Sequence, residues 1–201
     1  SCRLIRRALI AGVNSAGVHA ADLQVMPSAV NRHFLKTEGF DAGIHVQPSP
    51  SDPEVVHIRI FEPPGTPATP ALVKELDKHF SRQEFRRASW DEVGEITYSA
   101  RTAETYVQDL LAALDAGAIR RRGFRLVVDY AFSAASLVLP QVLGALDVEA
   151  VASHAYVSER RHASETVTLA ESLGRAKRLV AAIGADLGAV LDPAAERIFL
   201  I

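Results

Sequence analysis

The chain has 201 residues, of which 48 % are hydrophobic and 23 % charged, and its formal net charge at pH 7 is −2. This profile is typical of a soluble globular protein with one or two domains, and it excludes disordered and fibrous classes. A charge so close to neutral gives no general attraction to nucleic acid or to an anionic membrane, so we expect neither as a partner. Cys2 is the only cysteine, so no internal disulfide forms, and a cytoplasmic location is the default expectation.

The first half of the chain alternates between helical and extended patterns. A helical pattern opens it at residues 4–11, and a strand is expected over residues 17–25. Pro27 suits the first turn of a helix that continues to Glu38. Two short β-branched runs follow, and the proline-dense segment between them must be a loop, because proline cannot lie inside a strand ladder. These two runs cover residues 43–47 and 55–61.

A helix with a clear start signal follows the second run. Thr69 and Pro70 predict an N-cap and a proline at the first helical position. Leu72, Leu76 and Phe80 repeat at the spacing of one helix face. We therefore expect an amphipathic helix with one buried face.

The regular spacing of apolar residues is lost over residues 89–101, which predicts a boundary between domains at about residue 97. Beyond it, apolar strands alternate with helices long enough to connect parallel strands. The expected strands are residues 124–129, 148–151 and 186–191, and the expected helices are residues 102–114, 133–146 and 169–183. The fold class is therefore α/β, and the short apolar run at residues 197–201 predicts a last strand.

Ligands of open parallel sheets bind beyond the carboxyl ends of the strands. Asp129 and Asp192 fall at such ends and are therefore candidates for a functional site. The seven histidines show no zinc-type spacing, so we expect structural or exposed positions for them.

Three segments carry motifs of one family. Residues 43–61 read GIHVQPSPSDPEVVHIRIF, residues 127–135 read VVDYAFSAA, and residues 184–197 read GADLGAVLDPAAER. They resemble, in that order, three segments of the α-D-phosphohexomutases, the family of phosphomannomutase and phosphoglucomutase. These are the phosphoserine loop GIMITASHNPPEYNGIKVF, the segment VVVDxxNGAG and the metal loop GADLGIAFDGDGDR. The first alignment has no gap, and the resemblance covers the whole chain.

The resemblance implies two phosphohexomutase-like α/β/α domains. Residues 1–97 would be the later part of domain I with a mixed sheet, and residues 98–201 would be domain II with a mainly parallel sheet. We then expect a segment of a longer protein, without the third and fourth domains of the family. The resemblance is nearest to mutase-like regions of bacterial proteins similar to mannose-1-phosphate guanylyltransferase. It thus implies a nucleotidyltransferase domain as a partner in the same chain.

The segment that resembles the phosphoserine loop retains the serine of the family motif, but the residues next to this serine differ from the motif. By resemblance, Ser49 stands at the phosphoserine position, and Arg59 replaces the lysine that serves the family as general acid and base. A guanidinium stays protonated, so it holds a phosphate but accepts no proton. Pro50 and Ser51 replace the family's histidine and asparagine, which removes hydrogen-bond donors. Arg197 corresponds to a substrate-binding arginine.

The segment that resembles the metal loop also lacks groups on which the family's chemistry depends. Three aspartates at alternate positions aim carboxylates at Mg²⁺, and glycines between them permit the turn. Asp192 and Glu196 retain carboxylates at the first and third positions, and they are the expected metal ligands. The replaced positions are Ala194 for the second aspartate and Pro193 and Ala195 for the glycines. We therefore expect Mg²⁺ binding to be weak or lost.

These replacements favour a sugar-phosphate-binding or regulatory module with degraded transfer chemistry, whose ligand is a hexose phosphate. One alternative is a divergent phosphohexomutase that moves a phosphoryl group between O1 and O6 of a hexose phosphate through phospho-Ser49 with Mg²⁺. Another is a purely structural domain through which the protein forms a homo-oligomer.

Overall fold

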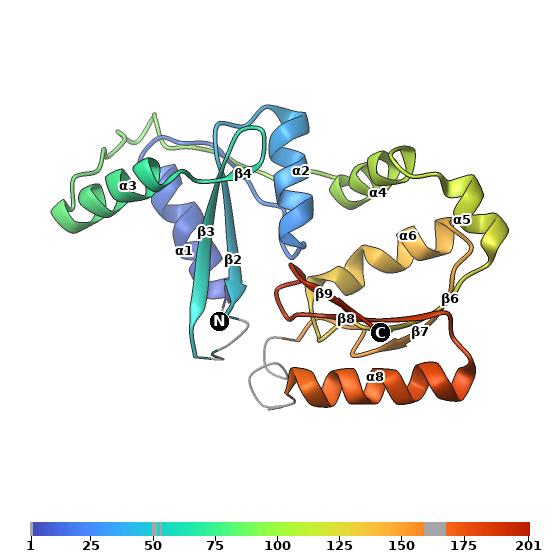
Figure 1. The fold of residues 1–201 in the computed structure, drawn as a ribbon. Helices are drawn as coiled ribbons and strands as arrows, with labels where there is room; N and C mark the ends of the chain where they lie inside the picture. The colour runs from blue at the N-terminus through green and yellow to red at the C-terminus, as the bar shows by residue number, and fades with distance from the viewer. Residues whose placement is uncertain (1, 50–51, 53, 159–167) are drawn as a thin grey trace. The chain divides into compact units, whose positions relative to one another are not determined.

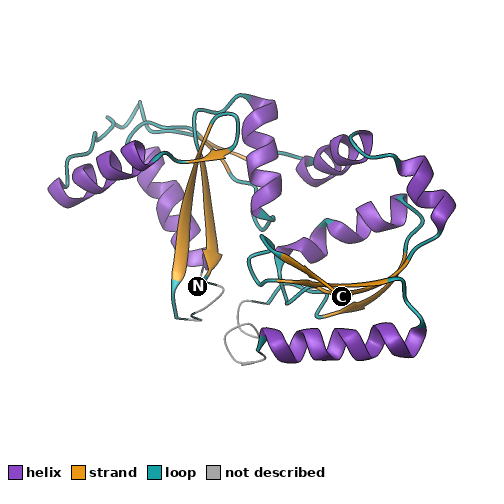
Figure 2. Cartoon of the chain, viewed as in Figure 1, coloured by secondary structure: helices purple, strands orange, loops and turns teal. Residues whose placement is uncertain are grey.

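A computed structural model places the chain in two compact units (Figures 1 and 2). The described residues are 2–49, 52, 54–158 and 168–201. The first unit comprises residues 1–24, 31–47 and 56–102, and the second comprises residues 25–30, 48–55 and 103–201. The predicted boundary at residue 97 stays a prediction.

The first unit contains short sheets and three helices, one of which begins in residues of the second unit. The helices are α1 (Cys2–Ser15), α2 (Ser28–Glu38) and α3 (Pro70–Arg82). Strands β2 (Gly43–Pro48), β3 (Val56–Glu62) and β4 (Thr66–Pro67) form one sheet, and β1 (Ala20–Ala21) pairs in parallel with β5 (Ile96–Thr97). The predicted helices and the two predicted β-branched strands are confirmed.

The strand predicted over residues 17–25 is much shorter than expected. Only Ala20–Ala21 are paired as a strand, because the backbone turns on either side of them. Gly17 and Gln24 have positive φ angles of 86° and 59°, which extended backbone does not adopt. The side chain of Asp22 accepts a hydrogen bond from the Gln24 backbone N–H at 2.8 Å, which closes a local turn.

Helix α3 begins as predicted, but its apolar face is not buried. The Leu72 N–H donates to the Thr69 side chain at 3.4 Å, and Pro70 occupies the first turn. No side chain of α3 is buried in the described part of the chain, and Phe80 is 86 % exposed. The expectation of a buried face was therefore wrong. Helical spacing shows which residues share a face, but not whether another element covers it.

The second unit is built on a four-stranded sheet whose order is β7-β6-β8-β9. Its strands are β6 (Arg125–Asp129), β7 (Glu149–Ser153), β8 (Leu187–Leu191) and β9 (Ile198–Leu200). Strand β6 pairs in parallel with both β7 and β8, and β9 runs antiparallel to β8. The predicted, mainly parallel sheet is confirmed.

Helices cover both faces of this sheet (Figure 1). Val127 and Val190 pack against helix α8 (Leu169–Ile183). Val128 and Leu191 pack on the opposite face, against residues of helix α6 (Leu139–Ala145). Successive strand residues point to opposite faces, so β6 and β8 each supply apolar side chains to both layers.

The connecting helices show two departures from the predictions. The helix predicted over residues 133–146 is divided into a 3₁₀ turn, η1 (Ala134–Leu137), and α6, with Pro140 in the first turn of α6. A short helix, α5 (Ala116–Arg122), was missed. Its signals are present in the sequence, since Asp115 caps its start and Gly123 ends it with a φ of 62°.

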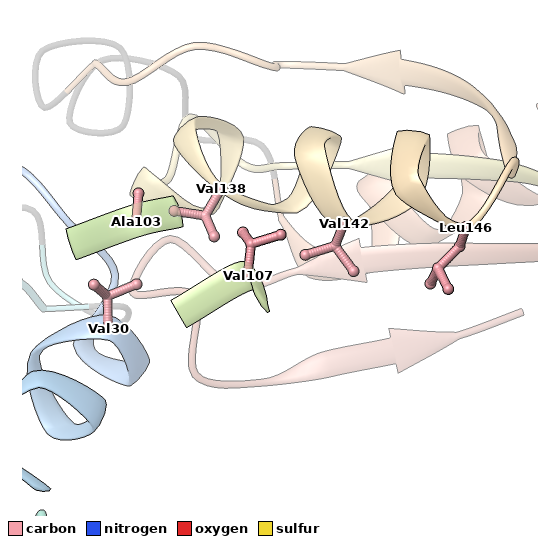
Figure 3. Close-up of a cluster of buried hydrophobic side chains, with 6 residues drawn as sticks. All are labelled: Val30, Ala103, Val107, Val138, Val142 and Leu146. Carbon is pink, nitrogen blue, oxygen red and sulfur yellow. The ribbon is translucent and has the colours of Figure 1, made fainter. Parts of the chain in front are cut away.

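A further apolar cluster completes the second unit (Figure 3). It joins the first turn of α2 to α4 (Thr102–Ala112) and α6. Its buried members are Val30, Ala103, Val107, Val138, Val142 and Leu146.

Among the described residues, no helix has both the length and the apolar character needed to cross a bilayer.

Candidate active site

Ser49 lies at the end of β2 and is almost fully buried, with 2 % of its surface exposed. Its backbone N–H donates to the Val55 carbonyl oxygen at 2.9 Å, and its side-chain oxygen accepts from the Asp52 N–H at 3.3 Å. These bonds fix the position of the serine where β2 passes into the loop that leads to β3. Pro50, Ser51 and Pro53 lie outside the described residues.

Arg59 lies on β3, in the strand next to β2, and its side chain is exposed. It acts electrostatically on His45 of β2. Burial lowers the pKa of His45 from 6.5 to about 4, and the positive charge of Arg59 contributes to this lowering. His45 is therefore neutral at pH 7 and adds no positive charge next to Arg59.

Asp192 directly follows β8 and holds the turn between β8 and β9. Its side-chain oxygen Oδ1 accepts hydrogen bonds from the Glu196 N–H at 2.7 Å and the Arg197 N–H at 3.1 Å. Its backbone N–H donates to the Arg197 carbonyl oxygen at 3.0 Å. Asp192 is 8 % exposed, and its side chain forms these hydrogen bonds within its own loop.

The residues of this loop do not fit Mg²⁺ as a family metal loop would. Asp192 Oδ1 is already an acceptor for two backbone N–H groups, whereas the Glu196 side chain is exposed. Ala194, which replaces the second carboxylate, is buried and has no oxygen to offer from its side chain. In the part of the chain that the structure describes, no three His, Cys, Asp or Glu side chains form a group suited to a metal ion. Asp192 and Glu196 stay predictions as ligands.

Ala195 adopts a backbone conformation that favours glycine, with a φ of 57°. We expect Ala195→Gly to stabilise the protein by about 0.5 kcal/mol, because relief of left-handed strain outweighs the loss of one methyl contact. The matched control is Ala194→Gly. Ala194 is buried and its φ is not positive, so this change is expected to destabilise by about 1 kcal/mol. Urea unfolding of both variants checks the opposite signs, and equal signs would contradict the assignment of strain to Ala195.

The other acidic candidate, Asp129, ends β6 and is paired with a histidine. His154, directly after β7, places its Nδ1 atom 2.9 Å from Asp129 Oδ1. The Ala131 N–H donates to the same oxygen at 3.0 Å, and Arg175 of α8 lies 3.7 Å from Oδ2. The His154 ring donates to Asp129 Oδ1 in the tautomer that carries its proton on Nδ1, because an ionised carboxylate only accepts.

Sequence reasoning identified Asp129 and missed His154. Asp129 pairs in register with Ser153, so the residue after each strand lies at the same edge of the sheet. A polar residue directly after a neighbouring parallel strand was the available signal. His154 also contacts the Phe132 ring, with the ring centroids 4.5 Å apart.

The second unit contains Ser49, Asp129, Asp192, Glu196 and Arg197, whereas Arg59 belongs to the first unit. The side chain of Arg197 is exposed, and its backbone closes the turn of the Asp192 loop. Asp129 and the loop that holds Asp192, Glu196 and Arg197 follow the carboxyl ends of the parallel strands β6 and β8, where α/β proteins place their ligands.

Comparison with known proteins identifies both halves of the chain. Residues 1–87 match the family model for phosphoglucomutase/phosphomannomutase α/β/α domain I, and residues 104–201 match that for domain II. The chain is 27 % identical to a probable phosphoglucosamine mutase of Methanopyrus kandleri, over its whole length and 43 % of that protein. It is 29 % identical to a phosphoglucomutase/phosphomannomutase of Thermococcus kodakarensis, over its whole length and 44 % of that protein. The chain thus spans less than half the length of these relatives.

Solved structures show the same fold. A putative phosphomannomutase from Thermus thermophilus matches with a TM-score of 0.79 and 18 % identity, over 97 % of this chain and 44 % of that one. A family protein from Burkholderia thailandensis matches with a TM-score of 0.78 and 21 % identity, over 96 % of this chain and 42 % of that one. Domain models that together match most of the chain show that it belongs to the phosphoglucomutase/phosphomannomutase family, as its domains I and II.

Proposed function

We propose that the chain is a hexose-phosphate-binding module in which the phosphoryl-transfer chemistry of the family is degraded. The observation that carries this proposal is the bonding of Asp192. Its Oδ1 atom holds two backbone N–H groups, while the neighbouring position of a family carboxylate is the buried Ala194. A phosphoryl transfer that depends on Mg²⁺ needs several carboxylate oxygens free to bind the cation.

The basic residues support binding rather than proton transfer. Arg59 and Arg197 are exposed cations, and a guanidinium binds phosphate through two parallel hydrogen bonds. Neither side chain accepts a proton from a sugar hydroxyl, because a guanidinium stays protonated. Ser49 would face the phosphate, Arg59 would replace the family's lysine as a phosphate-binding cation, and Arg197 would bind the substrate.

The setting we propose is nucleotide-sugar metabolism. Proteins of this family typically use Mg²⁺ and bind hexose phosphates. We propose that the module regulates or feeds a nucleotidyltransferase domain of a longer protein similar to mannose-1-phosphate guanylyltransferase. The names of the relatives make glucose, mannose and glucosamine phosphates the sugars to compare.

Calorimetric titration with glucose 1-phosphate tests the binding function. We expect saturable binding that glucose does not reproduce and that Arg197→Ala weakens about tenfold, since a charge-assisted hydrogen bond contributes about 1.5 to 3 kcal/mol. Lys177→Ala, a change of a cation on α8, is the control and should leave the affinity unchanged. Absence of binding to glucose, mannose and glucosamine phosphates would contradict the proposal.

A second candidate, the divergent enzyme, is favoured by the preserved and anchored Ser49. Intact mass after incubation with glucose 1,6-bisphosphate and Mg²⁺ separates it from the binding module. A gain of one phosphoryl group that Ser49→Ala abolishes would establish the enzyme. If the chain binds no sugar phosphate but self-associates in sedimentation experiments, the structural assembly domain would be correct instead.

A further inference from the structure

His154 has one ring nitrogen bonded to a buried carboxylate and a second nitrogen that is open to a ligand. The Asp129 side chain is 3 % exposed and the His154 side chain 23 %, with Oδ1 and Nδ1 2.9 Å apart. Nε2 of His154 has no hydrogen-bond partner among the described residues. With the proton on Nδ1, Nε2 carries a lone pair and is a hydrogen-bond acceptor. The pair therefore orients the ring and leaves one acceptor for a ligand.

Two further contacts fix the carboxylate that orients this ring. The Ala131 N–H donates to Asp129 Oδ1 at 3.0 Å, and Arg175 Nη2 lies 3.7 Å from Oδ2. Arg175 is itself held, because its Nη2 group donates to the Ser172 hydroxyl at 3.4 Å. Since both oxygens of Asp129 have neighbours, the direction of the His154 ring is set before any ligand arrives, which lowers the entropy cost of binding.

Aromatic rings lie beside the imidazole. The centroid of the Phe132 ring is 4.5 Å from that of His154 and 5.1 Å from that of Tyr156, which is 50 % exposed. The Phe132 N–H donates to the His154 carbonyl oxygen at 3.1 Å and so joins the segments that follow β6 and β7. Phe132 and His154 have positive φ angles of 56° and 49°. Each costs about 1 to 2 kcal/mol, and such conformations cluster at ligand sites.

The acceptor and the rings together select the chemistry of the ligand. A lone pair on Nε2 needs an O–H or N–H donor, whereas a fully ionised phosphate offers only acceptors. Sugar hydroxyls are such donors, and the C–H face of a hexose is apolar enough to pack against an aromatic ring. Strands β7 and β8 flank β6, so their carboxyl ends lie about 10 Å apart at one edge of the sheet. This distance is comparable to the length of a hexose phosphate.

We propose that His154 Nε2 accepts a hydrogen bond from a ring hydroxyl of a bound hexose phosphate, and that the sugar packs against the Tyr156 ring. The inference rests on the proposed function and names the part of the second unit that recognises the sugar. Asp129 acts through the imidazole and is a positioning residue. The loop after β8, which leads to Arg197, would bind the phosphate at the same edge of the sheet.

The first experiment records the imidazole ¹⁵N signals of the parent protein at about pH 8, above the ordinary pKa of histidine. In the free protein, Nε2 of His154 should be unprotonated. Its signal should move upfield during titration with glucose 1-phosphate, because Nε2 then accepts a hydrogen bond. His79 on the exposed helix α3 is the control, and its signals should stay in place. A proton on Nε2 of free His154, or an Nε2 signal that stays in place at saturation, would overturn the inference.

The second experiment uses variants in calorimetric titrations. His154→Phe keeps an aromatic ring beside Phe132 but has no acceptor, so it should weaken glucose 1-phosphate binding about three- to tenfold. Its control, His79→Phe, should bind as the parent does. Tyr156→Leu should weaken binding about threefold through lost ring contact, and Tyr98→Leu, a change of an exposed tyrosine of the first unit, should not.

Deoxy analogues of glucose 1-phosphate separate recognition from a structural role. The analogue that lacks the contacted hydroxyl should bind the parent protein more weakly than glucose 1-phosphate does, whereas His154→Phe should bind the two equally. If His154 only stabilises the fold, the variant has a lower free energy of unfolding and the parent and variant rank the analogues alike. If the variant fails to fold, the ¹⁵N spectra of the parent protein decide the question.

The two proposals fail in different ways. If glucose, mannose and glucosamine phosphates all fail to bind the parent protein, the proposed function fails and this inference fails with it. If they bind while the Nε2 signal stays in place and no analogue separates parent from variant, only the inference on His154 is overturned. Movement of the His154 and Tyr156 signals with guanosine monophosphate, but not with a hexose phosphate, would assign a nucleobase site and also overturn it.

Discussion

Acidification from pH 7 to pH 4 should destabilise the parent protein by up to about 3 kcal/mol more than it destabilises His45→Met. The pKa of His45 is lowered to about 4 in the folded protein, first by burial and then by Arg59, against 6.5 as its model value. Between these values the unfolded chain binds more protons than the folded protein, so stability falls as the pH decreases. The full contribution is present above pH 6.5 and is lost at about pH 4.

Urea unfolding at several pH values measures this difference. Methionine is the residue of the family motif at this position and fills a similar volume without a titrating group. His57→Met on the neighbouring strand is the matched control, and it should keep the steep decline of the parent protein because His45 is unchanged. Parallel pH profiles for the parent and His45→Met would show that the pKa of His45 is not lowered in the folded protein.

Asp192→Ala is expected to lower the free energy of unfolding by about 2 kcal/mol. The change removes the acceptor of two backbone hydrogen bonds, and bonds to a charged group are stronger than neutral ones. The loss is moderated because Glu196 and Arg197 are exposed residues and both hydrogen bonds are only partly buried. Asp192→Asn keeps an oxygen acceptor at the same place and should lose less than half as much.

Denaturant unfolding of both variants, with and without Mg²⁺, checks this role. A carboxylate that holds the loop affects stability equally in both solutions. If Mg²⁺ stabilises the parent protein and this stabilisation disappears in Asp192→Asn, then Asp192 acts as a metal ligand and the assignment to the turn is wrong.

Local signals predicted most of the helices and strands. The proline and threonine at the start of α3 located its first turn correctly, and the apolar runs located β6 and β8. The predictions that were wrong concern properties that the local residue pattern does not determine. The exposure of Phe80 depends on the elements around α3, and the short length of β1 depends on left-handed backbone at Gly17 and Gln24.

The sequence pointed to the positions of the candidate residues, but not to the hydrogen bonds that their side chains form. Motif resemblance located Ser49 and Asp192, and the rule on strand ends pointed to Asp129 as well. The commitment of Asp192 Oδ1 to its own loop, and the pairing of Asp129 with His154, required the folded backbone. The sequence also does not show that the buried Gln47 carboxamide has no hydrogen-bond partner among the described residues, because a glutamine in a strand is most often exposed.

The claim on which the proposed function depends is that the loop after β8 no longer binds Mg²⁺. Calorimetric titration of the parent protein with MgCl₂ tests it most directly, with the variant P193G/A194D/A195G/E196D as the comparison that restores the family motif. We expect no saturable binding by the parent protein at millimolar Mg²⁺ and binding at least about tenfold tighter by the variant, since two carboxylates are then aligned with Asp192. One Mg²⁺ bound per parent chain with micromolar affinity, and lost in Asp192→Asn, would contradict the account.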